Sequence, residues 1–176
     1  MAEQNIAYKI LSRGEIFKFD EIDRYELIEE IYYLRDDKLV LEKEYCEVKD
    51  FGYMPERIGD LLDIYDNGGT LAGAFDGDKL VGLGSICGEL IGKEKNMIQL
   101  ATLHVSTNYR DRGIGRKIVF ILKEKAKQIG AEKLYVSATP SKHTVDFYRG
   151  AGFELTPPVK ELFEKEPEDI HMEMLL

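Results

Sequence analysis

The segment at residues 110–117, with the sequence RDRGIGRK, combines two features that bind anions. Gly113 and Gly115 precede a stretch expected to be helical, and the first N–H groups of a helix have no intrahelical partner and lie at the positive end of its dipole. Glycine lets a phosphate approach these amides because it has no Cβ. Four basic side chains surround them: Arg110, Arg112, Arg116 and Lys117. The segment therefore predicts a diphosphate site.

The charge distribution supports this prediction. The chain has 176 residues and a formal net charge of −9, yet residues 107–127 hold 7 basic and 2 acidic side chains, against 9 and 18 in residues 1–66. A solvated helix face or a tight turn would also fit these residues, and the segment matches neither the dinucleotide fingerprint nor the P-loop. The net negative charge argues against nucleic acid as a partner and favours a cationic substrate.

The elements around this segment follow from hydrophobic periodicity. The pattern predicts strands over residues 6–11, 70–75, 80–90, 97–105, 134–138, 153–156 and 170–175, and helices over 55–66, 113–129 and 141–149. Asp76-Gly77 predicts a hairpin between the second and third of these strands. A further helix is expected after Asp20, its possible cap, with an apolar stripe of Leu27, Ile28, Ile31 and Leu34. Residues 38–48 fit a strand or a loop, and residues 157–167 an exposed loop.

The order of these features is more specific than any one of them. R-x-x-G-x-G follows a strand that ends Leu-x-Val, and a helix, a strand and S-x-x-T-x-x-F-Y-x-x-x-G-F at residues 141–153 come next. This arrangement resembles the GNAT superfamily of CoA-dependent acyltransferases over residues 68–155, and in outline beyond them. The resemblance implies one α/β (α+β) domain over residues 1–176. It would have a single mixed, mostly antiparallel sheet of about six or seven strands, flanked by about four helices and splayed after the fourth strand.

The resemblance also implies a binding mode for acetyl-CoA. The pyrophosphate would lie on the loop formed by Asp111, Arg112, Gly113, Ile114, Gly115 and Arg116, with Arg110 in a position that family members fill with Gln or Arg. The pantetheine arm would run beside Leu103, His104 and Val105, where the splayed strands leave backbone groups free. The amide of Leu103 would point at the thioester oxygen and stabilise the negative charge that develops there.

Two residues of the second motif receive roles from the same resemblance. Tyr148 matches the tyrosine that protonates the departing CoA thiolate, and a phenol remains protonated at neutral pH. It would otherwise be a core aromatic. Ser141 stands where the family often has an asparagine that contacts pantetheine, although helix capping alone would explain a serine there.

No general base is identified. The strand position where many family members carry a carboxylate is Gln99, and the position used on the next parallel strand is Val136. Neither side chain can accept the proton of an ammonium group. The substitutes considered are His104, His171, Glu173, Glu44, Glu47 and Asp50, with a water chain as the alternative. The pairs Glu29-Glu30 and Asp36-Asp37 are interpreted as solvated surface.

The resulting hypothesis is direct acetyl transfer from acetyl-CoA to a primary amine, with a cationic small molecule as the expected acceptor. A protein N-terminal or lysine acetyltransferase and a non-catalytic CoA-binding module are the alternatives. The two cysteines and three histidines show no disulfide or metal-site spacing, so no metal is expected. No apolar run has the length of a signal peptide or a membrane span, so a cytoplasmic protein without a membrane partner is expected; a homodimer is left open.

Overall fold

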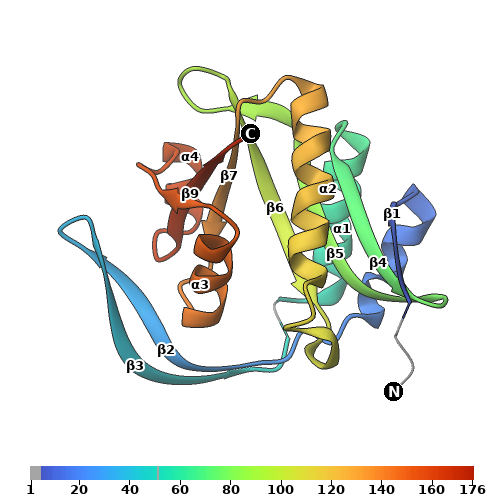
Figure 1. Cartoon of the computed structure of the whole chain (residues 1–176), viewed down its shortest axis with the longest axis horizontal. Coiled ribbons are helices and arrows are strands. Elements are labelled where there is room, and N and C mark those ends of the chain that lie inside the picture. Colours follow the sequence, from blue (N-terminus) through green and yellow to red (C-terminus); the bar gives the residue numbers. More distant parts are fainter. Residues whose placement is uncertain (1–4, 51) are drawn as a thin grey trace.

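The computed structural model describes residues 5–50 and 52–176 and contains a seven-stranded mixed sheet (Figure 1). Its strand order is β1-β4-β5-β6-β7-β9-β8, and every neighbouring pair is antiparallel except β6 and β7. The strands are β1 (Ile6–Ile10), β4 (Thr70–Asp76), β5 (Lys79–Ile91), β6 (Met97–Val105), β7 (Lys133–Ala138), β8 (Glu154–Leu155) and β9 (Ile170–Leu175). The expected fold class is thereby confirmed.

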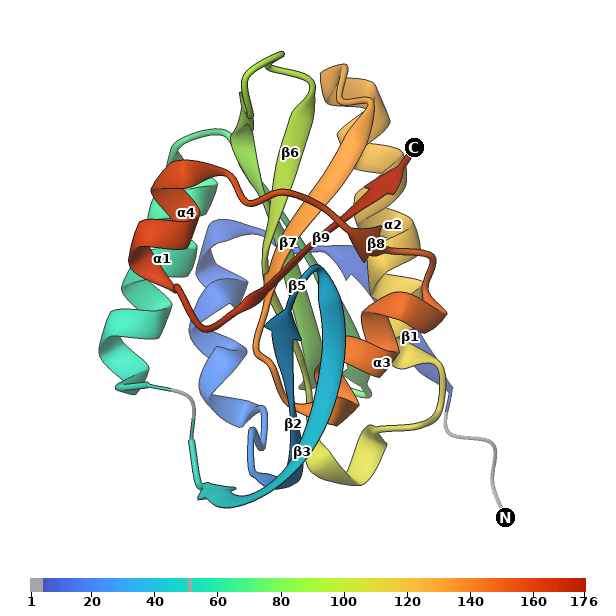
Figure 2. The same ribbon diagram turned by 90° about the vertical axis from the view of Figure 1, so that its left-hand side faces the viewer.

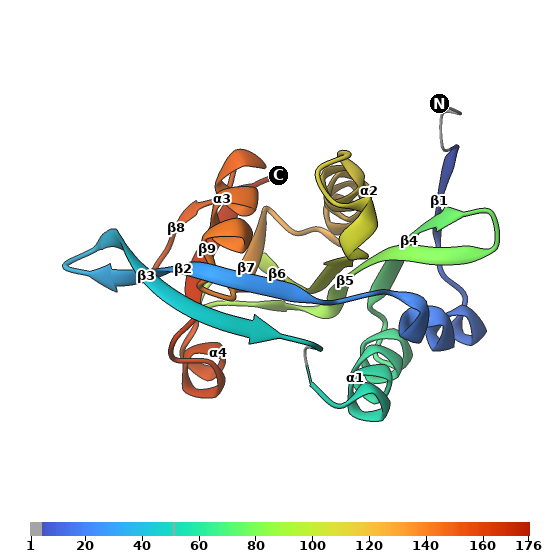
Figure 3. The ribbon, with the colours of Figure 1, turned by 90° about the horizontal axis from the view of Figure 1, so that it is seen from below.

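Helices cover both faces of this sheet. Figure 3 shows α2 and α3 on one face and α1 and α4 on the other. Their bounds are α1 (Met54–Asp66), α2 (Ile114–Ile129), α3 (Lys142–Gly150) and α4 (Lys160–Lys165), and two 3₁₀ helices are η1 (Arg13–Glu21) and η2 (Thr107–Tyr109). The expected helices at 55–66, 113–129 and 141–149 are confirmed. Residues 157–167, expected to be a loop, instead contain α4.

The principal core lies between α2 and the sheet. Ile118 and Leu122 are fully buried on the inner face of α2 and pack against β5. A Cβ on Gly84 of β5 would approach Ile118 Cγ2 to 2.6 Å, so only glycine lets the helix come this close. A second core, on the opposite face, joins η1 and α1 to β4 and β5 around Phe19 and Leu61. Apolar burial in the principal core thus fixes α2 against the sheet, together with the preceding loop at residues 111–116, which we call the glycine loop.

The segment after Asp20 was expected to be a helix, and this expectation is wrong. Residues Glu26–Arg35 form strand β2, which pairs with β3 (Lys38–Val48) in a separate antiparallel hairpin. Asp36 and Asp37 have φ values of 48° and 60° and form its two-residue turn, as a type I′ turn requires. The apolar spacing of the segment fits a helix, but pairing with β3 satisfies its backbone and decides the strand. Asp20 lies inside η1 and starts no helix.

The hairpin is attached to the main sheet through α3. The backbone N–H of Tyr32 donates to Pro140 O at 2.8 Å, and Ile31 forms an isolated β-bridge with Ser141. The Tyr32 hydroxyl donates to Asp146 Oδ1, also at 2.8 Å. Figure 2 shows the hairpin in front of the sheet, next to α3.

No helix in the described part of the chain is long and apolar enough to cross a bilayer.

Candidate active site

The central feature is the place where β6 and β7 separate. Their parallel pairing covers only Met97 to Gln99 on β6, so residues 100–105 continue without a partner on that side. This is the expected splay after the fourth strand of the sheet. A cavity of about 830 Å³ opens here. Its walls come from β2, from residues 100–105, from the glycine loop, and from the end of β7 with α3.

The glycine loop forms one end of this cavity. Gly113 is the N-cap of α2 in the left-handed conformation, with φ of 78°, and no side chain caps the helix. The first helical hydrogen bond runs from Lys117 N to Gly113 O at 3.0 Å. The N–H groups of residues 114–116 therefore have no acceptor within the helix. Arg110 is held beneath the loop because its Nε donates to Val105 O at 3.0 Å.

The two glycines of this loop are required for different reasons. A Cβ on Gly113 would meet no atom within 4 Å, so only the positive φ favours glycine there. A Cβ on Gly115 would lie 3.1 Å from the ring of Phe147, which is tighter than ordinary contact. Gly113 therefore sets the turn into α2, whereas Gly115 lets the first turn of α2 pack against α3.

Of the residues that the family resemblance places at acetyl-CoA, all but one line this cavity: Leu103, His104, Val105, Arg110, Asp111, Gly113, Ile114, Gly115, Arg116, Ser141 and Tyr148. Arg112 is the exception. Its guanidinium lies over the ring of Tyr109, with Cζ 5.5 Å from the ring centroid, and it is not part of the lining. Residues from β6, α2 and α3 are thus gathered around a common space.

Tyr148 combines core packing with access to the cavity. It is 5% exposed and makes edge-to-face contacts with Phe147 and Phe153, with ring centroids 5.2 Å apart in both pairs. It also belongs to the cavity lining. Burial raises the pKa of Tyr148 above the usual value of a phenol, so its hydroxyl carries a proton at neutral pH. The aromatic environment therefore keeps the group in the form that can donate.

Ser141 is the N-cap of α3, as its position after Pro140 predicts. Its Oγ accepts from the backbone N–H of Thr144 at 3.4 Å and lies 2.9 Å from Thr144 Oγ1. It also donates to Glu26 Oε1 at 3.0 Å. The single proton of the hydroxyl is thereby committed to Glu26, so any further contact at Ser141 would use it as an acceptor.

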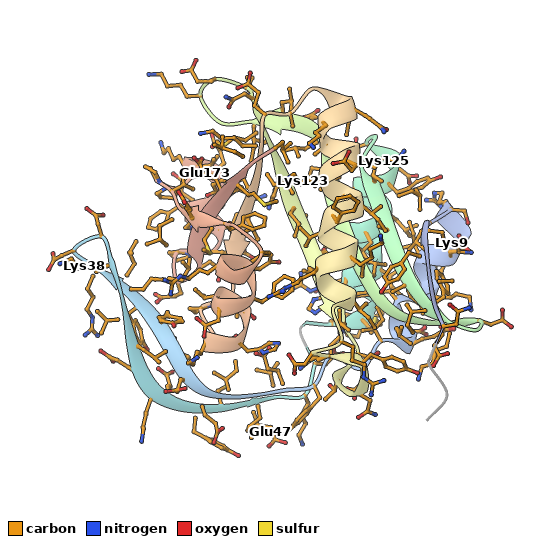
Figure 4. The ribbon with its side chains drawn as sticks, viewed as in Figure 1. Lys9, Lys38, Glu47, Lys123, Lys125 and Glu173 are labelled. Atoms are coloured by element: carbon orange, nitrogen blue, oxygen red, sulfur yellow. The ribbon has the colours of Figure 1, made fainter. Side chains whose placement is uncertain are left out.

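Most of the proton acceptors considered from the sequence lie outside the cavity. Gln99 accepts from Cys87 Sγ at 3.8 Å and is not part of the lining, whereas Val136 lines it but is apolar. Figure 4 shows Glu47 on the hairpin and Glu173 on β9, and Glu173 pairs with Lys133 at 2.9 Å. Glu44, Glu47, Asp50, His171 and Glu173 are all absent from the lining.

His104 is the one member of that set that does line the cavity. Its ring lies 5.9 Å from that of Phe19, measured between centroids. Burial, together with the guanidinium groups of Arg24, Arg57 and Arg110, lowers the pKa of His104 to about 3. It is consequently neutral at physiological pH and a poor proton acceptor.

One wall of the cavity is acidic, and no sequence motif predicted it. Glu26, Glu29 and Glu30 of β2 line the cavity together with Asp146 of α3. Glu29 is exposed, as its interpretation as solvated surface predicts, and Glu30 is half-buried, but both also line the cavity because their segment is a strand beside it. The Asp36-Asp37 turn, which favours a hairpin, was the available indication. Nothing in the sequence indicated that the hairpin would pack against α3.

Comparison with known proteins identifies the family. The sequence model of the acetyltransferase (GNAT) family matches residues 26–153. N-acetyltransferase YvbK of Bacillus subtilis (strain 168), itself described as uncharacterized, is 24% identical over 110 residues, covering 62% of this chain and 68% of that protein. The chain therefore belongs to the GNAT acetyltransferase family, as the motifs at residues 110–115 and 141–153 predicted.

Solved structures show the same fold along nearly the whole chain. The crystal structure of nourseothricin acetyltransferase has a TM-score of 0.74 at 15% identity, with 97% of this chain and 98% of that chain covered. A candidate streptothricin acetyltransferase from Bacillus anthracis str. Ames, in complex with acetyl coenzyme A, has a TM-score of 0.73 at 14% identity, with 98% and 99% covered. At these identities the similarity concerns the fold.

Proposed function

We propose that this protein transfers an acetyl group from acetyl-CoA to the primary amine of a cationic small molecule, by direct attack of the amine on the thioester. The observation that carries the proposal is the single cavity that joins the glycine loop, the unpaired end of β6 and the acidic wall of β2. It brings an anion-binding end and an acidic end to the same strand edge. A cofactor with a diphosphate and an acceptor with an ammonium group fit these two ends.

The glycine loop fits the diphosphate. Residues 114–116, whose N–H groups have no acceptor within α2, line the cavity together with Arg110. Amide donors at a helix N-terminus stabilise phosphate oxygens, and guanidinium groups add charge-assisted hydrogen bonds. The relative in complex with acetyl coenzyme A shares this fold over nearly its full length, which supports the same orientation here.

The unpaired part of β6 and Tyr148 fit the reacting end. The backbone N–H of Leu103 would donate to the thioester oxygen, and one such donor is worth about 3 kcal/mol in the transition state. The Tyr148 hydroxyl would protonate the thiolate as the C–S bond breaks. Both residues line the cavity, and α3 holds Tyr148 within the core.

The acidic wall supports a cationic acceptor. Glu29 and Glu30 line the cavity, and in the described chain no lysine or arginine forms a salt bridge with either of them, whereas Asp146 on the same wall is paired with Lys142. A concave surface of one charge sign raises the local concentration of oppositely charged ligands. An ammonium-bearing small molecule would be attracted to this wall before it reaches the thioester.

The test is an acceptor screen with detection of free thiol. Acetyl-CoA is supplied with polyamines, amino sugars, amino-acid amides and lysine-containing peptides, and calorimetry with CoA is run beside it. Thiol release with small cationic amines, and intersecting initial-rate lines, would support the proposal. Turnover only with peptides favours protein acetylation, heat of binding without turnover favours a non-catalytic module, and parallel lines would reject direct attack. Absence of any binding would reject the proposal as a whole.

A further inference from the structure

The proposed reaction needs a proton acceptor on the amine side. A primary ammonium group has no lone pair, so it must lose a proton before its nitrogen can attack the carbonyl carbon. Gln99 stands where the family resemblance placed a carboxylate, and its side chain lies outside the cavity in contact with Cys87. The acceptor must therefore come from another element.

Most titratable groups on the cavity wall are poorly suited to this task. Asp146 is already bonded to Lys142 and Tyr32, and although burial acts to raise its pKa, these hydrogen bonds lower it. His104 is kept neutral by its surroundings. Glu29 and His143 are exposed to solvent rather than enclosed within the wall. Asp111 belongs to the glycine loop, at the phosphate end.

Glu26 differs from all of these groups. It is only 9% exposed although it lines the cavity, and no described lysine, arginine or histidine forms a salt bridge with it. Its Oε1 accepts the proton of Ser141 Oγ at 3.0 Å. Within the described residues, its Oε2 accepts no hydrogen bond. The carboxylate is thus buried, oriented by one hydrogen bond and not neutralised by a cation.

Ser141 also relates this carboxylate to the rest of the site. As the N-cap of α3 it begins the helix that carries Tyr148. Glu26 and the proposed acid are therefore oriented by the two ends of one short helix. A base that deprotonates the amine and an acid that protonates the thiolate must be held in fixed positions around the same carbonyl group.

We infer that Glu26 is the general base of the acetyl transfer, an inference that rests on the proposed function. Its free carboxylate oxygen takes a proton from the acceptor ammonium, and the nitrogen lone pair that this releases forms the C–N bond. The C–S bond then breaks, its electron pair goes to sulfur, and Tyr148 supplies the proton of the thiol. The nitrogen still carries two protons at this stage and releases one of them to solvent, which gives the neutral amide. The Glu26 proton is returned to solvent, and solvent restores that of Tyr148.

The substitution Glu26→Gln tests this role with little change of shape. The amide oxygen of glutamine can still accept from Ser141, so the cap of α3 is retained. We expect kcat to fall about 10²- to 10⁴-fold at saturating acceptor, with the Kd for acetyl-CoA and the thermal midpoint essentially unchanged. Glu47→Gln is the matched control, since it removes a carboxylate from the same end of the hairpin but outside the cavity.

A second measurement separates proton transfer from electrostatic attraction. Amines whose conjugate acids have a pKa below 7 are already deprotonated at pH 7.5, so they should lose much less rate in Glu26→Gln than strongly basic amines do. A loss that is equal for all amines, or that appears only in KM, would overturn the inference. So would full activity of Glu26→Gln with basic amines. If wild-type protein turns over no amine, the proposed function itself fails, which is a distinct result.

Discussion

Ser141 Oγ lies 3.0 Å from Glu26 Oε1, although 115 positions separate the two residues in the chain. This hydrogen bond joins the start of β2 to the N-terminus of α3. The Tyr32 hydroxyl makes a second connection, to Asp146 one helical turn further on. The hairpin that provides the acidic wall and the helix that provides Tyr148 are therefore held together as one unit.

Removal of the Tyr148 hydroxyl should slow turnover without disturbing the fold. Phenylalanine preserves the edge-to-face contacts with Phe147 and Phe153 but has no proton to give the thiolate. We expect Tyr148→Phe to lower kcat by roughly one to three orders of magnitude. Steady-state thiol release at several pH values measures this, with CoA calorimetry as the binding control. A rate equal to wild type over the whole pH range would exclude Tyr148 as the acid.

The glycine that begins α2 should not tolerate a side chain. Gly113 has φ of 78°, and an L-residue there costs about 1–2 kcal/mol of unfolding free energy. Gly113→Ala should therefore destabilise the protein by that amount in urea and weaken CoA binding. Gly59→Ala is the control, because Gly59 lies in α1 at ordinary φ with open space around it. This control should gain about 0.5–1 kcal/mol, and a similar gain in Gly113→Ala would contradict the structure.

His104 should make the unliganded protein less stable in acid. The imidazole pKa is 6.5 in the unfolded chain and about 3 in the folded one, so between these values the unfolded state binds the additional proton. The stability that His104 contributes is therefore complete above pH 6.5 and is lost as the pH falls towards 3. Between pH 6.5 and 5 the loss is up to about 2 kcal/mol. Urea unfolding of wild type and His104→Gln at both pH values should show a smaller loss in the variant; equal losses would reject the shift.

Reversal of one charge on the acidic wall should weaken acceptor binding selectively. Glu30 lies on β2 beside the cavity, and Glu30→Lys places a cation where we propose that a cationic acceptor arrives. The KM for a basic amine should rise about tenfold or more at low ionic strength, and the increase should shrink with added salt. The Kd for acetyl-CoA is the internal comparison. A KM that does not respond to the substitution would remove the charge argument for a cationic acceptor.

The local elements of the fold could be predicted from the sequence because nearby residues determine them. The period of α2, the Asp76-Gly77 hairpin and the Ser141 cap each depend on a few adjacent side chains. The order of these elements, with the two glycines, was sufficient to indicate the family and the cavity residues of β6, α2 and α3. The helix predicted over residues 26–35 was wrong because their apolar spacing fits a helix, whereas pairing with β3 makes the segment a strand.

The proposed diphosphate end of the site could be predicted from the sequence, because a glycine turn, a helix N-terminus and the arginines around it are contiguous in the chain. The proposed acceptor end could not, because its residues come together only in the folded protein. Glu26 comes to lie beside Ser141 because the hairpin docks on α3, and Gln99 is withdrawn from the cavity because β6 is still paired with β7 at that point. Both arrangements depend on how distant segments pack together. The composition and periodicity of one segment give no information about its packing against another.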